Sequence, residues 1–151
     1  MARGWAARRG VEDAPPPREH VSIMPHLIFD SRLYDGYRQT MDAVPASGDQ
    51  RPLQIDPRSP MAAVDAALGF ISEGACMLLL EPALFGADVL LMLKRTCPVP
   101  LSPFSVSGEY LRLTDSGSDW RLLLELFTFL KRSGSDRIIT YAASELARAL
   151  S

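Results

Sequence analysis

Glu81 is the residue of this sequence best placed to do chemistry on a buried strand. It ends the run Cys76-Met77-Leu78-Leu79-Leu80-Glu81, an almost purely apolar stretch bounded by Gly74 and Pro82. Such a run is typical of a strand that is buried on both faces of a parallel sheet. In a barrel of strands and helices, the residue at the carboxyl end of a strand points into the site built there. Glu81 is therefore the first candidate for a functional carboxylate.

Covalent chemistry by a side-chain amine is restricted by the choice of basic residues. Of the 16 basic residues, 14 are arginine, and the only lysines are Lys94 and Lys131. Arginine binds carboxylates but does not lose its proton, so it cannot form an imine with a ketone. Any such chemistry would need one of these two lysines or the N-terminal amine.

Other titratable residues give weaker signals. His20 and His26 lie close to a proline break and are expected to be surface or structural residues, not a metal site or a catalytic pair. Glu109, Asp115 and Asp119 include a potential acid and base, but nothing in the sequence fixes their separation. A solvated turn at Glu109 and a helix cap at Asp119 are the preferred interpretation.

Composition places the chain among globular proteins. Its 151 residues are 47% hydrophobic and 23% charged, which suits one domain with its own core. A net charge of −2 argues against a nucleic-acid binder held by phosphate contacts. No apolar run reaches membrane-spanning length and no signal core is present, so a cytoplasmic location is expected. Cys76 and Cys97 are expected to be buried, reduced thiols, with one disulfide as the alternative.

Residues 1–20 are predicted to form a poorly ordered arm rich in arginine and proline, and residues 21–151 a single domain. Apolar extended segments alternate with helical patterns: extended at 21–24, 53–55, 76–81, 99–106 and 137–141, helical at 31–43, 59–72, 85–95, 119–131 and 142–150. A Ser-Gly turn is expected at Ser107. This alternation predicts an α/β fold with about four parallel strand–helix units, half of a closed TIM-type barrel.

The predicted helices carry more apolar surface than a solvated outer ring requires. The helix at 61–72 has one charged residue, Asp65, and five apolar residues follow one another from Val89 to Leu93. Helices that are apolar all round are buried on more than one side. A protein partner or a homo-oligomer is therefore expected to cover these helices.

Eight segments occur in the order, and at nearly the spacing, of one known family, apart from a deletion after Tyr110. They are Val21-Ser22-Ile23-Met24, Phe29–Arg38, Gly48-Asp49, Gln54-Ile55-Asp56-Pro57, Glu73-Gly74-Ala75, Val106-Ser107-Gly108-Glu109-Tyr110, Leu130-Lys131-Arg132-Ser133-Gly134 and Ile139-Thr140-Tyr141-Ala142. Together they resemble the C-terminal half of porphobilinogen synthase (5-aminolevulinate dehydratase), a barrel enzyme of tetrapyrrole synthesis.

The resemblance implies a loss of the family's chemistry. The family joins two 5-aminolevulinate molecules through two lysines that form Schiff bases with their keto groups, and these lysine positions hold Ile28 and Glu81 here. Neither side chain can form an imine. Lys94 and Lys131 are not expected to substitute, because they end outer helices at the opposite face of the barrel.

The resemblance also implies that no metal or cofactor is carried over. The family's zinc-binding cysteines belong to its N-terminal half, which the matching segments do not include. The glutamate that binds an allosteric magnesium in many members is replaced by Ala66.

Part of a substrate-binding apparatus is retained by resemblance. Ser107 and Tyr141 match hydroxyls that hold one substrate carboxylate, and Gln54 matches as well. Arg38 matches one arginine of the second carboxylate clamp, whose companion is replaced by Gln50. Survival through the constraints of the fold explains these residues at least as well as ligand binding does. An ion pair between Arg38 and Glu81 would even close the old site.

Three functions follow from these observations. The first is a catalytically inactive member of the family, a pseudoenzyme that serves as a structural or regulatory subunit of an oligomer or larger complex. The alternative is a non-catalytic sensor of 5-aminolevulinate or a similar carboxylate. The third, which the sequence favours least, is an active synthase-type lyase completed by a partner.

Overall fold

The computed structural model describes residues 22–36, 54–114 and 120–150. Within them, four strands form one parallel sheet in chain order: β1 (His26–Ile28), β2 (Leu78–Glu81), β3 (Leu101–Ser105) and β4 (Ile139–Thr140). The helices are η1 (Arg32–Tyr34), α3 (Pro60–Ser72), η3 (Leu84–Gly86), α4 (Ala87–Lys94), α5 (Ser107–Thr114), α6 (Trp120–Arg132) and α7 (Ala143–Leu150). The predicted half barrel of parallel strand–helix units is confirmed.

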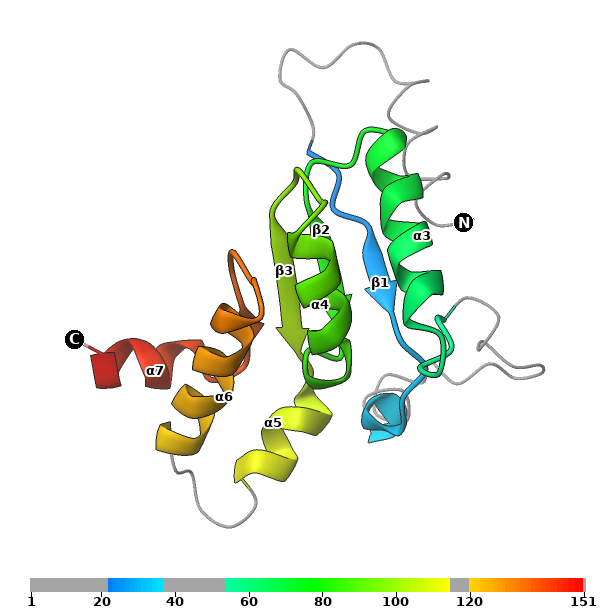
Figure 1. Ribbon diagram of the computed structural model, residues 1–151. Coiled ribbons are helices and arrows are strands. Elements are labelled where there is room, and N and C mark those ends of the chain that lie inside the picture. Colours follow the sequence, from blue (N-terminus) through cyan, green and yellow to red (C-terminus); the bar gives the residue numbers. More distant parts are fainter. Residues whose placement is uncertain (1–21, 37–53, 115–119, 151) are drawn as a thin grey trace, which may run out of the picture.

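Alternation along the strands divides the sheet into two faces. Leu27, Leu78, Leu80 and Leu101 are buried in one core cluster with residues of α3 and α4. Figure 1 shows these two helices lying along the sheet. Because successive side chains of a strand point to opposite faces, the intervening residues lie on the other face. We call this face the inner face; it carries His26, Ile28, Leu79, Glu81, Ser102 and Phe104.

The buried strand that the apolar run predicts is confirmed. Leu78, Leu79 and Leu80 are each no more than 3% exposed, and Glu81 is also buried. Pro82 follows directly and ends the strand. A second core cluster joins α6 and α7 through Leu123, Phe127, Leu130, Ala142 and Leu146. All four side chains of β2, on both of its faces, are therefore buried, including that of Glu81.

The first strand lies later in the chain than predicted. Residues 22–25 are not strand, and β1 begins at His26, directly after Pro25. Proline has no amide hydrogen to donate, but it is tolerated as the first residue of a strand because its carbonyl can still accept a hydrogen bond. Here the Pro25 carbonyl accepts from the Leu79 amide at 3.1 Å. Pro25 thus opens the strand instead of limiting it. Of the predicted helix at 31–43, the described part contains η1, and residues 37–43 lie outside the described residues.

The predicted Ser-Gly turn is wrong, because Ser107 begins helix α5. Gly108 is required there by close packing: a Cβ at this position would overlap the backbone carbonyl of Leu33 in η1. Contact with η1 thus places the start of α5 against the segment that follows β1. The expectation of buried thiols is also wrong for Cys76, which is exposed, while Cys97 is partly buried; both are free.

Among the described helices, none combines the length and the apolar character needed to cross a membrane. The predicted arm at 1–20 lies outside the described residues.

Candidate functional site

The carboxyl ends of β1 and β2 bring together the two positions that the resemblance assigns to lysines. Ile28 ends β1, Glu81 ends β2, and the two are direct partners in the parallel register. The residue after Ile28 extends this pairing, since the Phe29 amide donates to the Glu81 carbonyl at 2.9 Å. Side by side on the inner face, an aliphatic group and a carboxylate offer no nucleophilic nitrogen.

Glu81 is hydrogen-bonded to a histidine that was not predicted to belong to the site. The Nδ1 atom of His26 lies 3.0 Å from Oε1 of Glu81. The Glu81 side chain is only 10% exposed, whereas that of His26 is 46% exposed. No other described residue is hydrogen-bonded to the Glu81 side chain. The alternative partner considered for Glu81, Arg38, lies outside the described residues.

One sequence signal could have revealed this pair. His26 stands two residues before Ile28 on the same strand, so both side chains point to the same face. In register, His26 is the partner of Leu79, which stands two residues before Glu81 on β2. A strand-end carboxylate and a histidine on the neighbouring strand are therefore close, although 55 residues separate them in the chain. Neither residue alone indicates this contact.

Gln54 extends the inner face beyond β1. The backbone of Ile55 pairs with Phe29 as an isolated parallel bridge, with the Ile55 amide donating to the Ile28 carbonyl at 2.7 Å. Ile55 packs against the core under α3 and α4, so the preceding Gln54 faces the inner side. Its Oε1 atom is buried and accepts no hydrogen bond from the part of the chain that the structure describes. The predicted extended segment at 53–55 is thus confirmed for its described part.

Ser107 and Tyr141 lie at the ends of the next two strands. Ser107 follows β3 and Tyr141 follows β4, whose paired residues are neighbours in the sheet. The Tyr141 side chain is 53% exposed, and its ring lies 6.0 Å from that of Phe104 and 6.3 Å from that of Tyr110. No described residue is hydrogen-bonded to its hydroxyl. Among the described residues, the hydroxyl therefore caps no backbone group.

Glu109 is a structural carboxylate, which corrects the prediction of a solvated turn. It is 1% exposed, and its two oxygens accept from the Leu84 amide at 2.8 Å and the Val106 amide at 3.0 Å. Burial raises the pKa of Glu109 above its usual value, and the backbone hydrogen bonds oppose that shift. Its partner Leu84 is 25 residues distant, so no local pattern predicts the contact. Asp115 and Asp119 lie outside the described residues.

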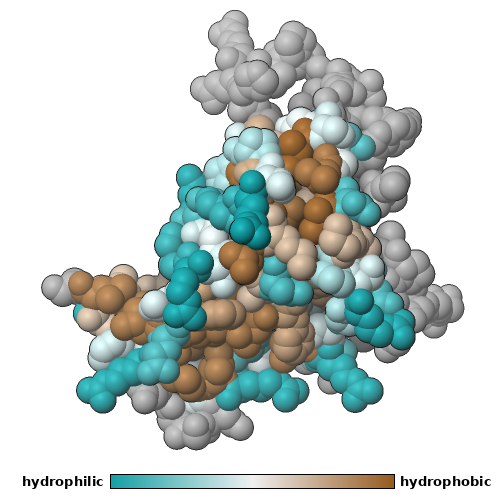
Figure 2. Space-filling model, viewed as in Figure 1, coloured by the Kyte–Doolittle hydropathy of each residue, from teal (hydrophilic) through white to brown (hydrophobic). Residues whose placement is uncertain are grey.

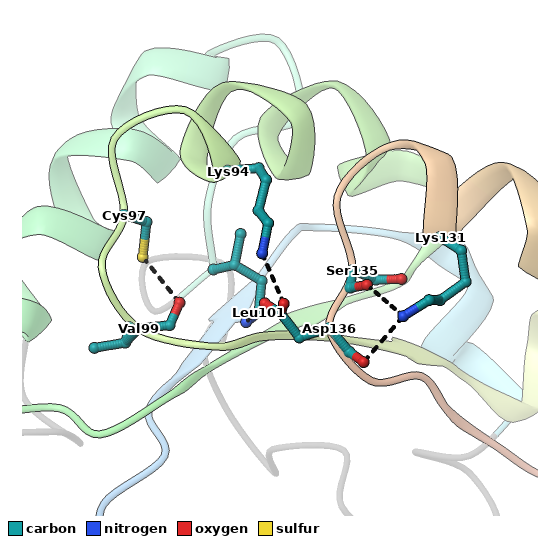
Figure 3. Close-up of polar contacts among 7 residues, drawn as sticks. All are labelled: Lys94, Cys97, Val99, Leu101, Lys131, Ser135 and Asp136. Carbon is teal, nitrogen blue, oxygen red and sulfur yellow. Dashed lines mark hydrogen bonds and ion pairs between the residues drawn. The ribbon is translucent and has the colours of Figure 1, made fainter.

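Both lysines lie at the other end of the sheet, as predicted. The Nζ atom of Lys94 is 2.7 Å from Oδ1 of Asp136, and Lys131 donates to the backbone carbonyls of Ser135 and Asp136 at 2.9 and 3.1 Å (Figure 3). Asp136 also accepts from the amide of Leu101, the first residue of β3. The hydrogen bond from Lys94, with that from Leu101, lowers the pKa of Asp136. These amines hold the starts of β3 and β4 and lie far from Ile28 and Glu81.

Among the described residues, no group of three or more His, Cys, Asp or Glu side chains is arranged to hold a metal ion. His26 and Glu81 are two such side chains, and Gln54 adds an amide oxygen on the same face. The position of the family's magnesium ligand, Ala66, lies within α3 and has no donor atom. The polar groups described at this end of the sheet are the imidazole of His26, the carboxylate of Glu81, the amide of Gln54 and the hydroxyls of Ser107 and Tyr141.

Comparisons with known proteins point to one family. Its model, described as delta-aminolevulinic acid dehydratase, matches residues 6–149. The chloroplastic delta-aminolevulinic acid dehydratase of Glycine max is 33% identical over 138 residues, which are 87% of this chain and 34% of that protein. The Bacillus subtilis enzyme of that name is 32% identical over 135 residues, 85% of this chain and 42% of that protein.

A solved structure has the same architecture. The Toxoplasma gondii delta-aminolevulinic acid dehydratase, in complex with its reaction product porphobilinogen, superposes with a TM-score of 0.78 at 31% sequence identity. The match covers 85% of this chain and 38% of that one. This chain thus spans well under half of the length of each of these relatives, and its sheet matches part of their barrel. It belongs to the delta-aminolevulinic acid dehydratase family.

Proposed function

We propose that this chain is a non-catalytic member of its family, with a structural or regulatory role in an oligomer or larger complex. The observation that carries the proposal is the pair at the carboxyl ends of β1 and β2, where Ile28 and Glu81 are register partners. By resemblance these are the positions of the two Schiff-base lysines. Without a side-chain amine, the site cannot activate the keto group of a substrate as an imine.

The placement of the remaining lysines supports this proposal. Lys94 and Lys131 end their helices beside the starts of β3 and β4, and both donate to Asp136 or its neighbours. An amine that takes part in an imine must be neutral and must reach the keto carbon. From the opposite end of the sheet, neither lysine reaches the carboxyl ends of β1 and β2. A turnover assay with 5-aminolevulinate is expected to yield no porphobilinogen, and product formation by the purified chain would overturn the proposal.

Exposed apolar side chains support the role as a subunit. Figure 2 shows apolar surface gathered over the region of α5 and α6, with a further area over α3. Large hydrophobic side chains that are more than a third exposed include Met61, Leu68, Phe85, Leu91, Leu111, Leu122, Phe129 and Leu150. Contiguous apolar surface of this kind marks interaction sites in soluble proteins. Light scattering after size exclusion should give a mass above 16.6 kDa or show a complex; a stable monomer would contradict this role.

A second candidate is a sensor that binds 5-aminolevulinate or a similar carboxylate without turnover. The exposed Tyr141, whose hydroxyl has no described hydrogen-bond partner, supports it, together with Ser107 at the neighbouring strand end. Calorimetry with 5-aminolevulinate is expected to show binding that is lost in the double variant Tyr141→Phe, Arg38→Ala. Absence of heat with the wild-type chain would reject this candidate.

A further inference from the structure

Three residues of neighbouring extended segments form a row on the inner face: Gln54, Ile28 and Glu81. Ile55 bridges to Phe29, so the preceding residue, Gln54, stands beside Ile28, and Ile28 in turn stands beside Glu81. Neighbouring strands are about 4.8 Å apart, which places Gln54 and Glu81 about 10 Å apart at the backbone. Their side chains flank the aliphatic side chain of Ile28 on the same face.

Both flanking residues offer hydrogen-bond acceptors that the described residues leave unused. Oε1 of Gln54 is buried without a donor. Glu81 accepts one hydrogen bond, from His26 to Oε1, and no described residue donates to its Oε2. Buried acceptors in folded proteins nearly always have donors, and a group left without one calls for an explanation. Oε1 of Gln54 is such a group. It lies across the apolar side chain of Ile28 from Oε2 of Glu81, and the two oxygens together are complementary to a donor that carries carbon on one side.

We propose that this row binds a small ligand through a primary ammonium group. An ammonium has three N–H donors and no acceptor, so it can donate to Oε2 of Glu81 and Oε1 of Gln54 while its carbon chain lies on Ile28. The negative charge of Glu81 favours a cation and disfavours a carboxylate at the same point. His26 keeps the carboxylate oriented from the other side.

This inference rests on the proposed function, in which Ile28 and Glu81 stand where lysines would otherwise lie. In such a site the amine comes from the ligand instead of from a protein lysine, and the protein supplies the hydrogen-bond acceptors. 5-Aminolevulinate carries such an amine next to its keto group, which makes it a suitable probe. The side chain of His26 is half-exposed, so solvent reaches the inner face beside Ile28, two residues further along β1.

The test compares three probes of the same chain length by calorimetry with the full chain: 5-aminolevulinate, 5-aminovalerate, which lacks the ketone, and levulinate, which lacks the amine. Ammonium recognition predicts that the two amines bind about equally and that levulinate binds at least about tenfold more weakly. Glu81→Gln should weaken both amines by about tenfold, and Gln54→Glu should tighten them. Asp65→Asn, which removes an exposed carboxylate of α3, is the matched control and should change nothing.

Binding of levulinate as tight as that of 5-aminovalerate would overturn the inference, as would amine binding that Glu81→Gln leaves unchanged. Absence of binding by either amine would also overturn it. Circular dichroism of each variant separates lost binding from lost folding, and Gln54→Leu offers a second, independent variant if Glu81→Gln does not fold. None of these results bears on imine formation, so the proposed loss of catalysis stands or falls on turnover and trapping measurements alone.

Discussion

The two ends of the sheet differ in how their polar groups are satisfied. At the starts of β3 and β4, Lys94, Lys131, Asp136 and the Leu101 amide form one connected set of hydrogen bonds. At the ends of β1 and β2, Glu81 has a single described partner, His26, and the side-chain oxygen of Gln54 has none. The first arrangement links the starts of two strands, although among the described residues the buried Ser135 hydroxyl beside it has no partner. The second leaves a buried amide oxygen without a described donor, a group that calls for an explanation.

The same contrast occurs within the carboxyl end of the sheet. Beside β3, Glu109 is buried and accepts from two backbone amides, and Gly108 packs on the carbonyl of Leu33. These contacts to backbone groups hold the β3 half of the end. In the half formed by β1 and β2, Oε1 of Gln54 accepts no hydrogen bond from the described residues. The β3 half therefore depends on residues other than Ile28 and Glu81.

Glu109→Ala should have the largest effect on stability. It leaves the amides of Leu84 and Val106 buried without an acceptor, and each such loss costs about 1–3 kcal/mol. We expect the free energy of unfolding to fall by about 4 kcal/mol in urea denaturation. A fall below about 1 kcal/mol would show that the β3 side is not fixed by this carboxylate.

Glu109→Gln provides a pH test of the same contact. Burial raises the pKa of Glu109 above 4.5, so between that value and the raised pKa the folded chain binds more protons than the unfolded chain. The free energy of unfolding contributed by this group therefore falls as the pH rises through that window. Glutamine cannot titrate, so the difference in stability between wild type and variant should shrink above pH 4.5. A difference that does not vary with pH would contradict the burial of a titrating carboxyl.

Gly108→Ala should rank next. The added Cβ overlaps the Leu33 carbonyl, and because backbone atoms cannot move aside easily, we expect a loss of about 3 kcal/mol. Gly69→Ala is the matched control, since a Cβ there meets no atom within 4 Å and α3 should gain about 0.5–1 kcal/mol. Equal stability of the two variants would place the close contact between α5 and η1 in doubt.

Asp136→Asn tests the opposite end of the sheet and should have the smallest effect. The Lys94 and Asp136 side chains are 45% and 36% exposed, so their ion pair contributes at most about 1 kcal/mol. The pKa of Asp136 is lowered below 3.8, so its contribution is present above that pH and is lost as the pH falls through the lowered pKa. Thermal unfolding measured at decreasing pH from 7 should thus show the difference between wild type and variant shrinking once the pH falls below 3.8. A difference that stays constant as the pH falls would assign the effect to packing.

Local sequence predicted β2 well and β1 poorly. The run of apolar residues before Pro82 is long enough to identify a buried strand, which ends at Glu81 as predicted and begins at Leu78, two residues after the predicted start. Pro25, in contrast, can either end or open a strand, and only the hydrogen bond from Leu79 decides between the two. The choice depends on a partner 54 positions along the chain, which sequence patterns near Pro25 do not contain.

The site shows the same division. Glu81 ends its strand as predicted, whereas Ile28 lies beyond the predicted strand at 21–24 and the structure places it at the end of β1, as the register partner of Glu81. The hydrogen bond between His26 and Glu81 and the burial of Glu109 both depend on contacts across 25 or more residues. Such contacts are determined by the register of the sheet and by how the loops cross its end. They become visible only when the strands are assembled.

The proposal that this chain forms no imine is tested most directly by borohydride trapping with 5-aminolevulinate, followed by mass spectrometry of the intact chain. We predict an unchanged mass for the wild-type chain, because neither Ile28 nor Glu81 supplies an amine and both lysines lie at the other end of the sheet. Reducible adducts on Lys94 or Lys131 in the folded chain would contradict it.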